Sequence, residues 1–288
     1  MNNEISLEQF PSRPRVELFF KWLMFTAAIS AMALLSTYYP IWGNIPLIVI
    51  PSILTLLFAK PVFFEKIKLF TLVTMRTLIV FAVLFDFGQI YSDIIMIMMI
   101  INILEATLTD FKHKQYFNFV SGIFLALGVL AMTPAWGANA GGPGSGMDYY
   151  FVDGFNKTAT ICWVVAYTIW NWIFVTGEFS ASVSLLHTGF LSAPMLLCLI
   201  TMPSVGFAGG FGLWYLVRAN TLSIGGYMQI CCKNWFETQF YSPRFEKFVA
   251  WTHKWYVQMV LMIVCLALIG YTFVGGIMTN GLVSGWFN

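Results

Sequence analysis

Long apolar runs follow one another along this chain, separated by short polar turns. A helix that crosses a bilayer needs about 20 mostly apolar residues, and a chain built from such runs buries its backbone polar groups in helices. The pattern predicts an all-α, polytopic integral membrane helical bundle with about nine transmembrane helices. The expected spans are Leu18–Tyr39, Pro40–Ala59, Leu69–Phe85, Ile94–Thr109, Phe117–Met132, Thr158–Thr176, Phe179–Met202, Pro203–Met228 and Trp255–Gly275.

The composition supports a membrane protein and argues against several other classes. Hydrophobic residues make up 59% of the chain and charged residues 10%, whereas a soluble domain carries roughly 25% charged residues. The net charge of +2 is too small to indicate nucleic-acid binding. The five cysteines form no C-x-x-C pair and the three histidines are dispersed. We therefore expect the lipid bilayer as a partner, no nucleic acid, no metal site and no cofactor.

The number of spans depends on one glycine-rich segment. Residues 203–228 contain Arg218 and a set of glycines: Gly209, Gly210, Gly212, Gly225 and Gly226. In a membrane helix, glycine at this density indicates close helix packing or a discontinuous helix that lines a cavity. We expect a broken or thinly packed helix here. If this segment only re-enters the membrane, the chain has eight spans.

Three segments outside the spans complete the single domain expected over residues 1–288. Residues 1–17 form a polar N-terminal segment, and residues 133–157 form a glycine-rich loop that we expect on the external side. Residues 233–251 mix aromatic and charged side chains, which is typical of an amphipathic helix lying in the membrane interface. Ser242 and Pro243 resemble an N-cap followed by proline at the first helical position.

The distribution of basic residues predicts the orientation. Membrane proteins retain Lys and Arg in short cytoplasmic loops. With nine alternating spans and a cytoplasmic N-terminus, one basic residue, Lys157, falls outside. The other basic residues outside the expected spans lie inside: Arg13, Arg15, Lys60, Lys66, Lys68, Lys112, Lys114, Lys233, Arg244, Lys247 and Lys254. We therefore expect a multi-pass cell-membrane protein with its N-terminus in the cytoplasm and its C-terminus outside.

Polar side chains inside the spans are the candidate site residues, because an ionisable group in a bilayer is costly unless it is satisfied. Asn102 and Glu105 share one helical face, and Asn171 and Glu178 share another. A hairpin turning at Gly177 brings Asn171 to the same depth as His187. The candidates for ligand binding or proton relay are Arg76, Asn102, Glu105, Tyr167, Asn171, Glu178, Ser184, His187 and Arg218.

These residues predict a polar cavity that opens to the cytoplasm. In this interpretation Glu105 or Glu178 pairs with Arg76 or Arg218, and His187 titrates near neutral pH. The alternative is structural. Asn, Ser and Thr side chains commonly form hydrogen bonds across membrane helices, worth about 0.6 kcal/mol each. Glu178 and Arg218 could also reach water at the membrane surface.

Three functions remain open from the sequence. The favoured hypothesis is a small transporter or channel-like protein whose ligand is a small molecule, an ion or a lipid, with proton coupling through Glu105 and His187. The alternative is a membrane enzyme acting on a lipid or isoprenoid, with His187 as general base and Arg76 holding an anionic head group. The third is a structural or assembly subunit of a membrane complex. No catalytic residue and no oligomeric state can be assigned.

Overall fold

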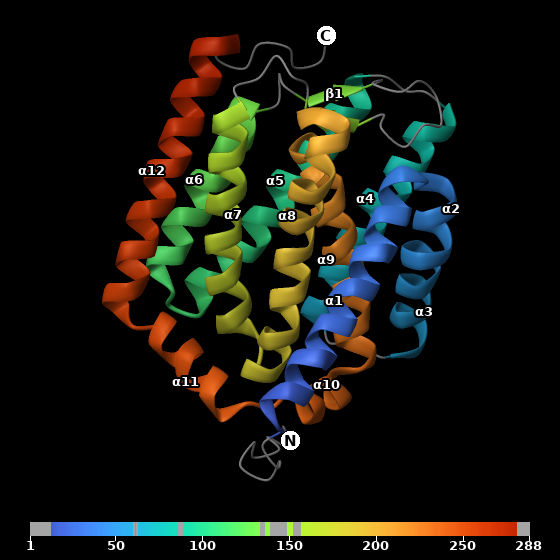
Figure 1. Cartoon of the computed structure of the whole chain (residues 1–288). Helices are drawn as coiled ribbons and strands as arrows, with labels where there is room; N and C mark the ends of the chain where they lie inside the picture. Colours follow the sequence, from blue (N-terminus) through green and yellow to red (C-terminus); the bar gives the residue numbers. More distant parts are fainter. Residues whose placement is uncertain are drawn as a thin grey trace.

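Helices account for nearly all of the chain described by the computed structural model, which covers residues 13–59, 61, 63–85, 89–132, 136–138, 149–151 and 157–280. The long helices stand side by side in an upright bundle (Figure 1). The helices are α1 (Arg15–Tyr38), α2 (Pro40–Asn44), the π-helical turn η2 (Ile45–Val49), α3 (Ile50–Phe58), α4 (Phe63–Phe85), α5 (Gln89–Lys112), α6 (Tyr116–Met132), α7 (Lys157–Glu178), α8 (Ala181–Gly209), the 3₁₀ turn η4 (Phe211–Leu213), α9 (Trp214–Cys231), α10 (Lys233–Gln239), α11 (Pro243–Thr252) and α12 (Trp255–Asn280).

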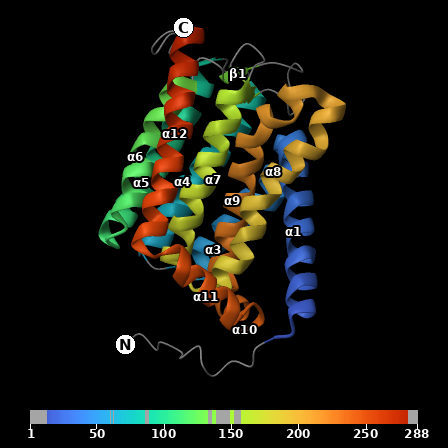
Figure 2. The same cartoon turned by 60° about the vertical axis from the view of Figure 1, so that its left-hand side comes forward.

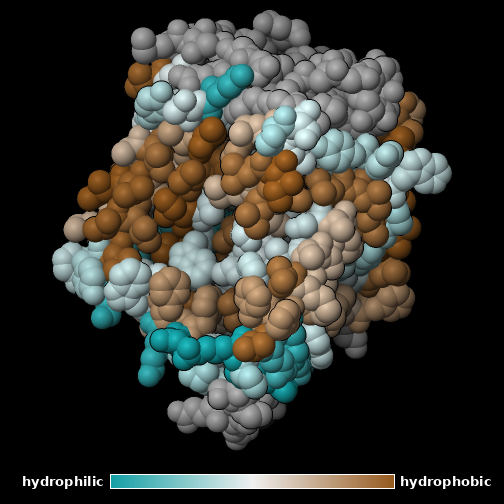
Figure 3. Space-filling model, viewed as in Figure 1, coloured by the Kyte–Doolittle hydropathy of each residue, from teal (hydrophilic) through white to brown (hydrophobic). Residues whose placement is uncertain are grey.

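Several helices are long and apolar enough to cross a membrane, which indicates a membrane protein. Within the described residues there are five: 15–38, 41–58, 157–178, 181–204 and 255–275. The expected count of about nine spans is not confirmed. The helices α4, α5, α6 and α9 nevertheless stand in the same bundle (Figures 1 and 2). Figure 3 shows an apolar band across the middle of the molecule and a hydrophilic surface at its lower end.

The second expected span is continuous but irregular. Pro46 lies in the π-helical turn η2, and Pro51 follows at the start of α3. Proline removes one backbone hydrogen bond, and a π-helical turn is a common way for a helix to absorb that loss. The span begins close to α1, where Asn44 Nδ2 donates a 3.0 Å hydrogen bond to the carbonyl of Ser36.

The boundary between the seventh and eighth expected spans differs from the prediction. We expected it after Met202, but α8 continues through Pro203 to Gly209. The chain reverses at Gly210, where a built Cβ would lie 2.8 Å from Met202 Cβ and 3.0 Å from the carbonyl oxygen of Cys198. Glycine is needed at this position because the returning chain passes directly against α8.

The expected eighth span, residues 203–228, is broken at Gly210, as one of the two predicted alternatives required, but the helix that follows is not thinly packed. Helix α9 runs without interruption from Trp214 to Cys231 and packs against α1, α3, α4 and α8. Most of its side chains are buried, including those of Arg218 and Asn220. Its glycines provide close helix packing: Gly225 faces the ring of Phe190 on α8. Helix α9 therefore lies near the centre of the bundle.

The lower end of the bundle carries two short helices where one interfacial helix was expected. Helices α10 and α11 are separated by residues 240–242 and lie across the base of the bundle (Figure 1). The predicted cap is confirmed: Phe245 N donates a 3.4 Å hydrogen bond to Ser242 Oγ, and Pro243 follows at the first helical position. Their position relative to a membrane surface stays a prediction.

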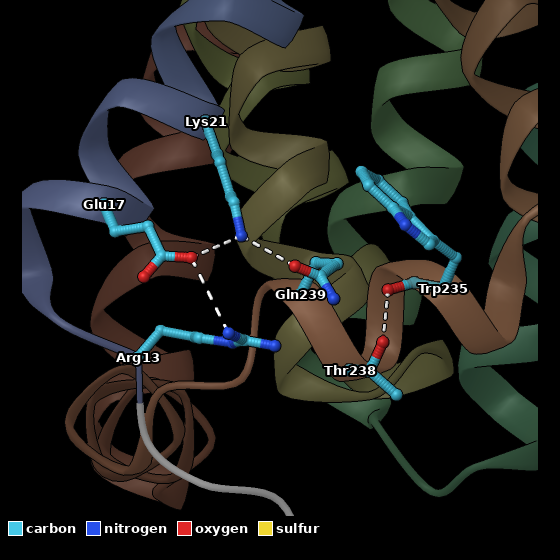
Figure 4. Close-up of polar contacts among 6 residues, drawn as sticks. All are labelled: Arg13, Glu17, Lys21, Trp235, Thr238 and Gln239. Atoms are coloured by element: carbon cyan, nitrogen blue, oxygen red, sulfur yellow. Dashed lines mark hydrogen bonds and ion pairs between the residues drawn. The ribbon is translucent and has the colours of Figure 1, made fainter.

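Helix α10 is tied to the start of α1 by polar contacts (Figure 4). Lys21 Nζ donates hydrogen bonds to Glu17 Oε1 at 2.5 Å and to Gln239 Oε1 at 2.6 Å. Within α10, Thr238 Oγ1 donates to the carbonyl of Trp235 at 2.9 Å. Lys21 therefore connects the start of α1 to the end of α10.

The upper end contains the exception to the all-helical pattern. Strands β1 (Trp136–Ala138) and β2 (Tyr149–Phe151) pair antiparallel, with Trp136 opposite Phe151. They belong to the glycine-rich segment 133–157, and the rest of that segment before Lys157 lies outside the described residues. Helix α1 begins at the lower end and α12 finishes at the upper end (Figure 2), the arrangement that an odd number of crossings produces.

Candidate functional site

A cavity of about 270 Å³ opens near the lower end of the bundle, between the start of α4, the turn from α7 to α8, α9 and α10. We call it the lower cavity. Its lining residues are Glu65, Lys68, Leu69, Leu72, Glu178, Phe179, Ser180, Val183, His187, Leu222, Gly226, Gln229, Ile230, Lys233 and Glu237. Of the predicted site residues, Glu178 and His187 line this cavity.

The α7–α8 hairpin supplies both of these side chains. Helix α7 ends at Glu178, directly after Gly177, where a built Cβ would overlap the side chain of Gln115. Ser180 begins the next helix by accepting a 3.4 Å hydrogen bond from the backbone N–H of Val183. The predicted hairpin is present, but its turn lies at Phe179 and Ser180, because Gly177 is still part of α7. The hairpin brings the end of α7 and the first turns of α8 to one wall of the lower cavity.

His187 is buried and held in one orientation. Its Nδ1 lies 2.8 Å from Gln229 Nε2 on α9, and its ring packs edge-on against Phe190 at 5.2 Å between centroids. An amide nitrogen can only donate, so Nδ1 accepts and the proton of the neutral ring is on Nε2. Nε2 is buried and has no hydrogen-bond partner among the described residues. His187 is therefore a lining residue of the lower cavity whose N–H donor has no partner in the described part of the chain.

Glu178 does not pair with an arginine. Its Oε2 lies 3.3 Å from His113 Nδ1, in the turn that follows α5. Lys68 takes the place of the expected arginine as the positive charge near Glu178 and Glu105. Its ammonium lies 4.7 Å from the ring centroid of Phe174. We had assigned Lys68 to a cytoplasmic turn. Lys68 and Leu72 are four residues apart on α4, so they share one face of the helix. This spacing could have indicated that Lys68 faces the same cavity as Leu72.

Glu105 stands behind the lower cavity and does not line it. Its side chain is half-buried, and Oε1 has no hydrogen-bond partner among the described residues. Lys68 is the positive charge that acts on it. The expected pairing of Glu105 with Arg76 or Arg218 is not present in the described part of the chain.

Arg218 lies deeper in the bundle and has neutral partners. Its Nη2 donates a 2.9 Å hydrogen bond to Asn171 Oδ1, and its Nη1 donates a 3.2 Å bond to the carbonyl of Phe190. The guanidinium also lies 5.6 Å from the ring centroid of Tyr167. The structure therefore brings three predicted residues together: Tyr167, Asn171 and Arg218. Arg218 is buried and does not reach water at the surface.

A second, much smaller cavity of about 20 Å³ adjoins this cluster, and we call it the core cavity. It is lined by Met75, Met99, Asn102, Tyr167, Trp214, Tyr215, Arg218, Ala219 and Leu222. Asn102 thus joins Tyr167 and Arg218 in this lining. Leu222 on α9 lines both cavities, so its side chain forms part of the wall between them.

Arg76 belongs to a third polar group. Its Nη1 donates a 2.6 Å hydrogen bond to Asn220 Oδ1, and Asn220 Nδ2 donates a 2.9 Å bond to Thr37 Oγ1. Arg76 is buried and lines neither cavity. Ser184 also stays outside both linings, where its hydroxyl donates a 3.4 Å bond to the carbonyl of Val175. The predicted residues are thus spread over several places.

A buried carboxylate that sequence reasoning missed connects α5, α6 and α7. Asp110, 1% exposed, accepts a 2.8 Å hydrogen bond from Asn118 Nδ2, and the same amide donates to the carbonyl of Trp170 at 3.2 Å. The fourth expected span ends at Thr109, so the prediction leaves Asp110 outside the membrane helix. Because Lys112 and Lys114 follow closely, the local charge pattern indicates a solvated turn, and only helix packing shows that Asp110 is enclosed.

The comparisons do not identify the chain. No protein family, no curated protein and no solved structure matches it. Among the described residues no group of three or more His, Cys, Asp or Glu side chains has an arrangement that could hold a metal ion. The case for a function therefore depends on the two cavities and the charges around them.

Proposed function

We propose that this chain is a small transporter or channel-like protein of the cell membrane. In this proposal the nine long helical segments of the described chain all cross the bilayer: α1, α2–α3, α4, α5, α6, α7, α8, α9 and α12. The lower end, with the start of α1 and with Lys233, Arg244 and Lys247 on α10 and α11, faces the cytoplasm. The lower cavity is then the cytoplasmic entrance to a binding site.

The observation that carries the proposal is the pair of cavities along α9. The lower cavity opens near the basic end, the core cavity lies next to Arg218 and Asn102, and Leu222 lines both. A polar site in the interior of a membrane bundle, approached from one end and separated from it by an apolar side chain, is what a gated pathway requires. A purely structural subunit has no need of such an arrangement.

The lining of the lower cavity supports a small charged solute. Lys68 and Lys233 contribute positive charge, and Glu65, Glu178 and Glu237 contribute negative charge. Ser180, His187 and Gln229 add polar groups, and apolar side chains fill the remainder. The volume of about 270 Å³ lies just below the usual range of small-molecule sites, about 300–1,000 Å³. We therefore favour a solute the size of an amino acid or a short carboxylate over a lipid.

His187 and Glu105 have separate roles in this proposal. His187 Nε2–H has no partner among the described residues, and a carboxylate or carbonyl oxygen of the solute would accept a hydrogen bond from it. Glu105, behind Lys68, is the residue that would exchange a proton as the solute charge enters or leaves. The enzyme hypothesis has less support, because Arg76, its expected head-group ligand, is buried against Asn220 and lines neither cavity.

Flux through purified protein in liposomes tests the proposal. Proteoliposomes are loaded with radiolabelled alanine, acetate or methylammonium, which probe a zwitterion, an anion and a cation, and with a pH-sensitive dye in a parallel set. We expect efflux of at least one probe above that of protein-free liposomes, reduced at least about tenfold by His187→Ala, which removes about 1.4 kcal/mol or more of interaction with the solute.

A matched histidine variant serves as the control. His253 lies between α11 and α12 and does not line the lower cavity, so His253→Ala should keep the flux of the unmodified protein. If none of the probes and no protons cross faster than in protein-free liposomes, transport is rejected. If His187→Ala and His253→Ala reduce flux equally, the lower cavity is not the pathway.

A further inference from the structure

Two arginines are buried in this bundle with neutral partners. Arg76 is 1% exposed and donates to Asn220, and Arg218 is 3% exposed and donates to Asn171 and to the carbonyl of Phe190. Among the described residues no Asp or Glu oxygen lies within 4.0 Å of either guanidinium. Both arginines therefore carry a positive charge into the interior without an ion pair.

An arrangement of this kind is costly. Buried charges in proteins are ordinarily paired, because hydrogen bonds from neutral groups replace only part of the hydration that an ion loses. In a membrane, the surrounding lipid adds no compensation. Glu105 does not form an ion pair with either arginine, because no oxygen of its carboxylate lies within 4.0 Å of a guanidinium nitrogen. An anion bound from solution would supply the negative charge that the described carboxylates do not.

The core cavity collects unused hydrogen-bond donors around Arg218. Arg218 Nε and Trp214 Nε1 are both buried without a partner among the described residues, and both residues line this cavity. Asn102, on the opposite side in α5, adds an amide to the lining. No Asp, Glu or other acidic side chain belongs to the lining. A mostly apolar site whose lining residues include N–H donors and no carboxylate favours an anion over a cation.

We infer that the core cavity is a binding site for one small monovalent inorganic anion of halide size. Its volume of about 20 Å³ exceeds the roughly 10–15 Å³ that one water-sized particle needs, and it leaves no room for an organic ligand. The anion accepts hydrogen bonds from Arg218, Trp214 and Asn102, and its charge balances the Arg218 guanidinium. This inference stands whether or not the protein transports a solute.

Asn102 gives the site its sharpest test. Asn102→Asp keeps the shape of the side chain and places a fixed carboxylate in the cavity lining, where it can replace the anion as the counter-charge of Arg218. Gln229→Glu is the matched control. It makes the same amide-to-carboxylate change in the lining of the lower cavity, away from the core cavity.

The experiment compares thermal unfolding of the purified full chain in detergent, in sodium chloride or bromide against sodium gluconate at equal ionic strength. We expect halide to raise the midpoint saturably, by at least about 2 °C. Asn102→Asp should have a raised midpoint in gluconate and no halide response, whereas Gln229→Glu should keep the response. Crystals grown in bromide should show one anomalous peak between Asn102 and Arg218.

Three results would overturn the inference. The first is an unmodified protein whose midpoint is the same in halide and gluconate. The second is a halide response of full size in Asn102→Asp. The third is bromide-grown crystals with a water in the core cavity and no anomalous peak. None of these results decides whether the protein transports a solute, and absence of flux would leave halide binding intact.

Discussion

The guanidinium of Arg218 on α9 and the side-chain oxygen of Asn171 on α7 are joined by a 2.9 Å hydrogen bond in the interior of the bundle. Asn171 is 4% exposed, so the bond is shielded from solvent. The bond ties the hairpin that lines the lower cavity to the helix that separates the two cavities. The position of the site therefore depends on this pair.

Removing the acceptor from this pair should weaken the fold. Asn171→Ala leaves Arg218 with one fewer partner for a buried charge, and we expect a loss of roughly 1.5–3 kcal/mol in the free energy of unfolding. Unfolding in mixed detergent micelles measures the loss. Asn234→Ala, an exposed change on α10, should stay within about 0.5 kcal/mol of the unmodified protein. Equal effects from the two variants would show that the Arg218–Asn171 bond contributes little.

The close packing of Gly225 on α9 against Phe190 on α8 leads to a second prediction, about stability. A Cβ at Gly225 would lie 2.5 Å from two ring carbons of Phe190, and that ring is fully buried and cannot move aside. Gly225→Ala should therefore destabilise the protein by about 1–3 kcal/mol. At Gly270 a Cβ would meet nothing within 4 Å, so Gly270→Ala should be neutral or stabilising by up to about 1 kcal/mol. Thermal unfolding of the two variants in the same detergent compares them directly, and a stable Gly225→Ala protein would contradict the close packing.

His253 predicts a dependence of stability on pH. It lies in the turn between α11 and α12, where Thr176 Oγ1 is 2.8 Å from Nε2 and Gln258 Nε2 is 3.0 Å from Nδ1. Burial lowers the pKa of His253 below its ordinary value of 6.5. The unfolded chain therefore takes up a proton before the folded chain does, and the stability that this neutral ring contributes is complete above about pH 6.5 and declines as the pH falls toward the lowered pKa.

The variant His253→Gln isolates this effect. Between pH 8 and pH 5 the unmodified protein should lose more stability than the variant, because the variant has no group at this position to protonate. The measurement is the difference in unfolding free energy between the two proteins at each pH. A difference that stays constant across the range would exclude His253 as a contributor.

The orientation in the membrane can be tested with native thiols. Cys231 and Cys232 are exposed at the lower end of α9, whereas Cys198 and Cys265 are buried; Cys162 on α7 is partly exposed, so the labelling uses a Cys162→Ser background. A membrane-impermeant maleimide should label inverted vesicles and spare intact cells, because we place this end in the cytoplasm. Replacing both Cys231 and Cys232 by serine should abolish the labelling. Strong labelling of intact cells would reverse the proposed topology.

Many of the helices could be predicted from the sequence because their limits are set locally. Apolar length indicated the helices, Gly177 indicated a turn that begins two residues later, at Phe179, and Ser242 with Pro243 indicated the start of α11. These signals depend on neighbouring residues alone, through hydrophobicity, backbone freedom and capping. The end of α8 could not be predicted in this way, since Pro203 does not stop the helix and the reversal at Gly210 depends on its approach to Met202.

By itself, the sequence determined that the chain is an apolar, helical membrane protein whose interior contains charged and amide side chains. The tertiary structure decided which of them meet. Arg76 and Arg218 lie in separate polar groups, and each donates a hydrogen bond to an asparagine side chain where a glutamate was expected. Lys68, expected in a solvated turn, lines the lower cavity. The reason is geometric: spacing along a helix shows which side chains share a face, whereas a partner on another helix is set by rotation, tilt and packing of the whole bundle.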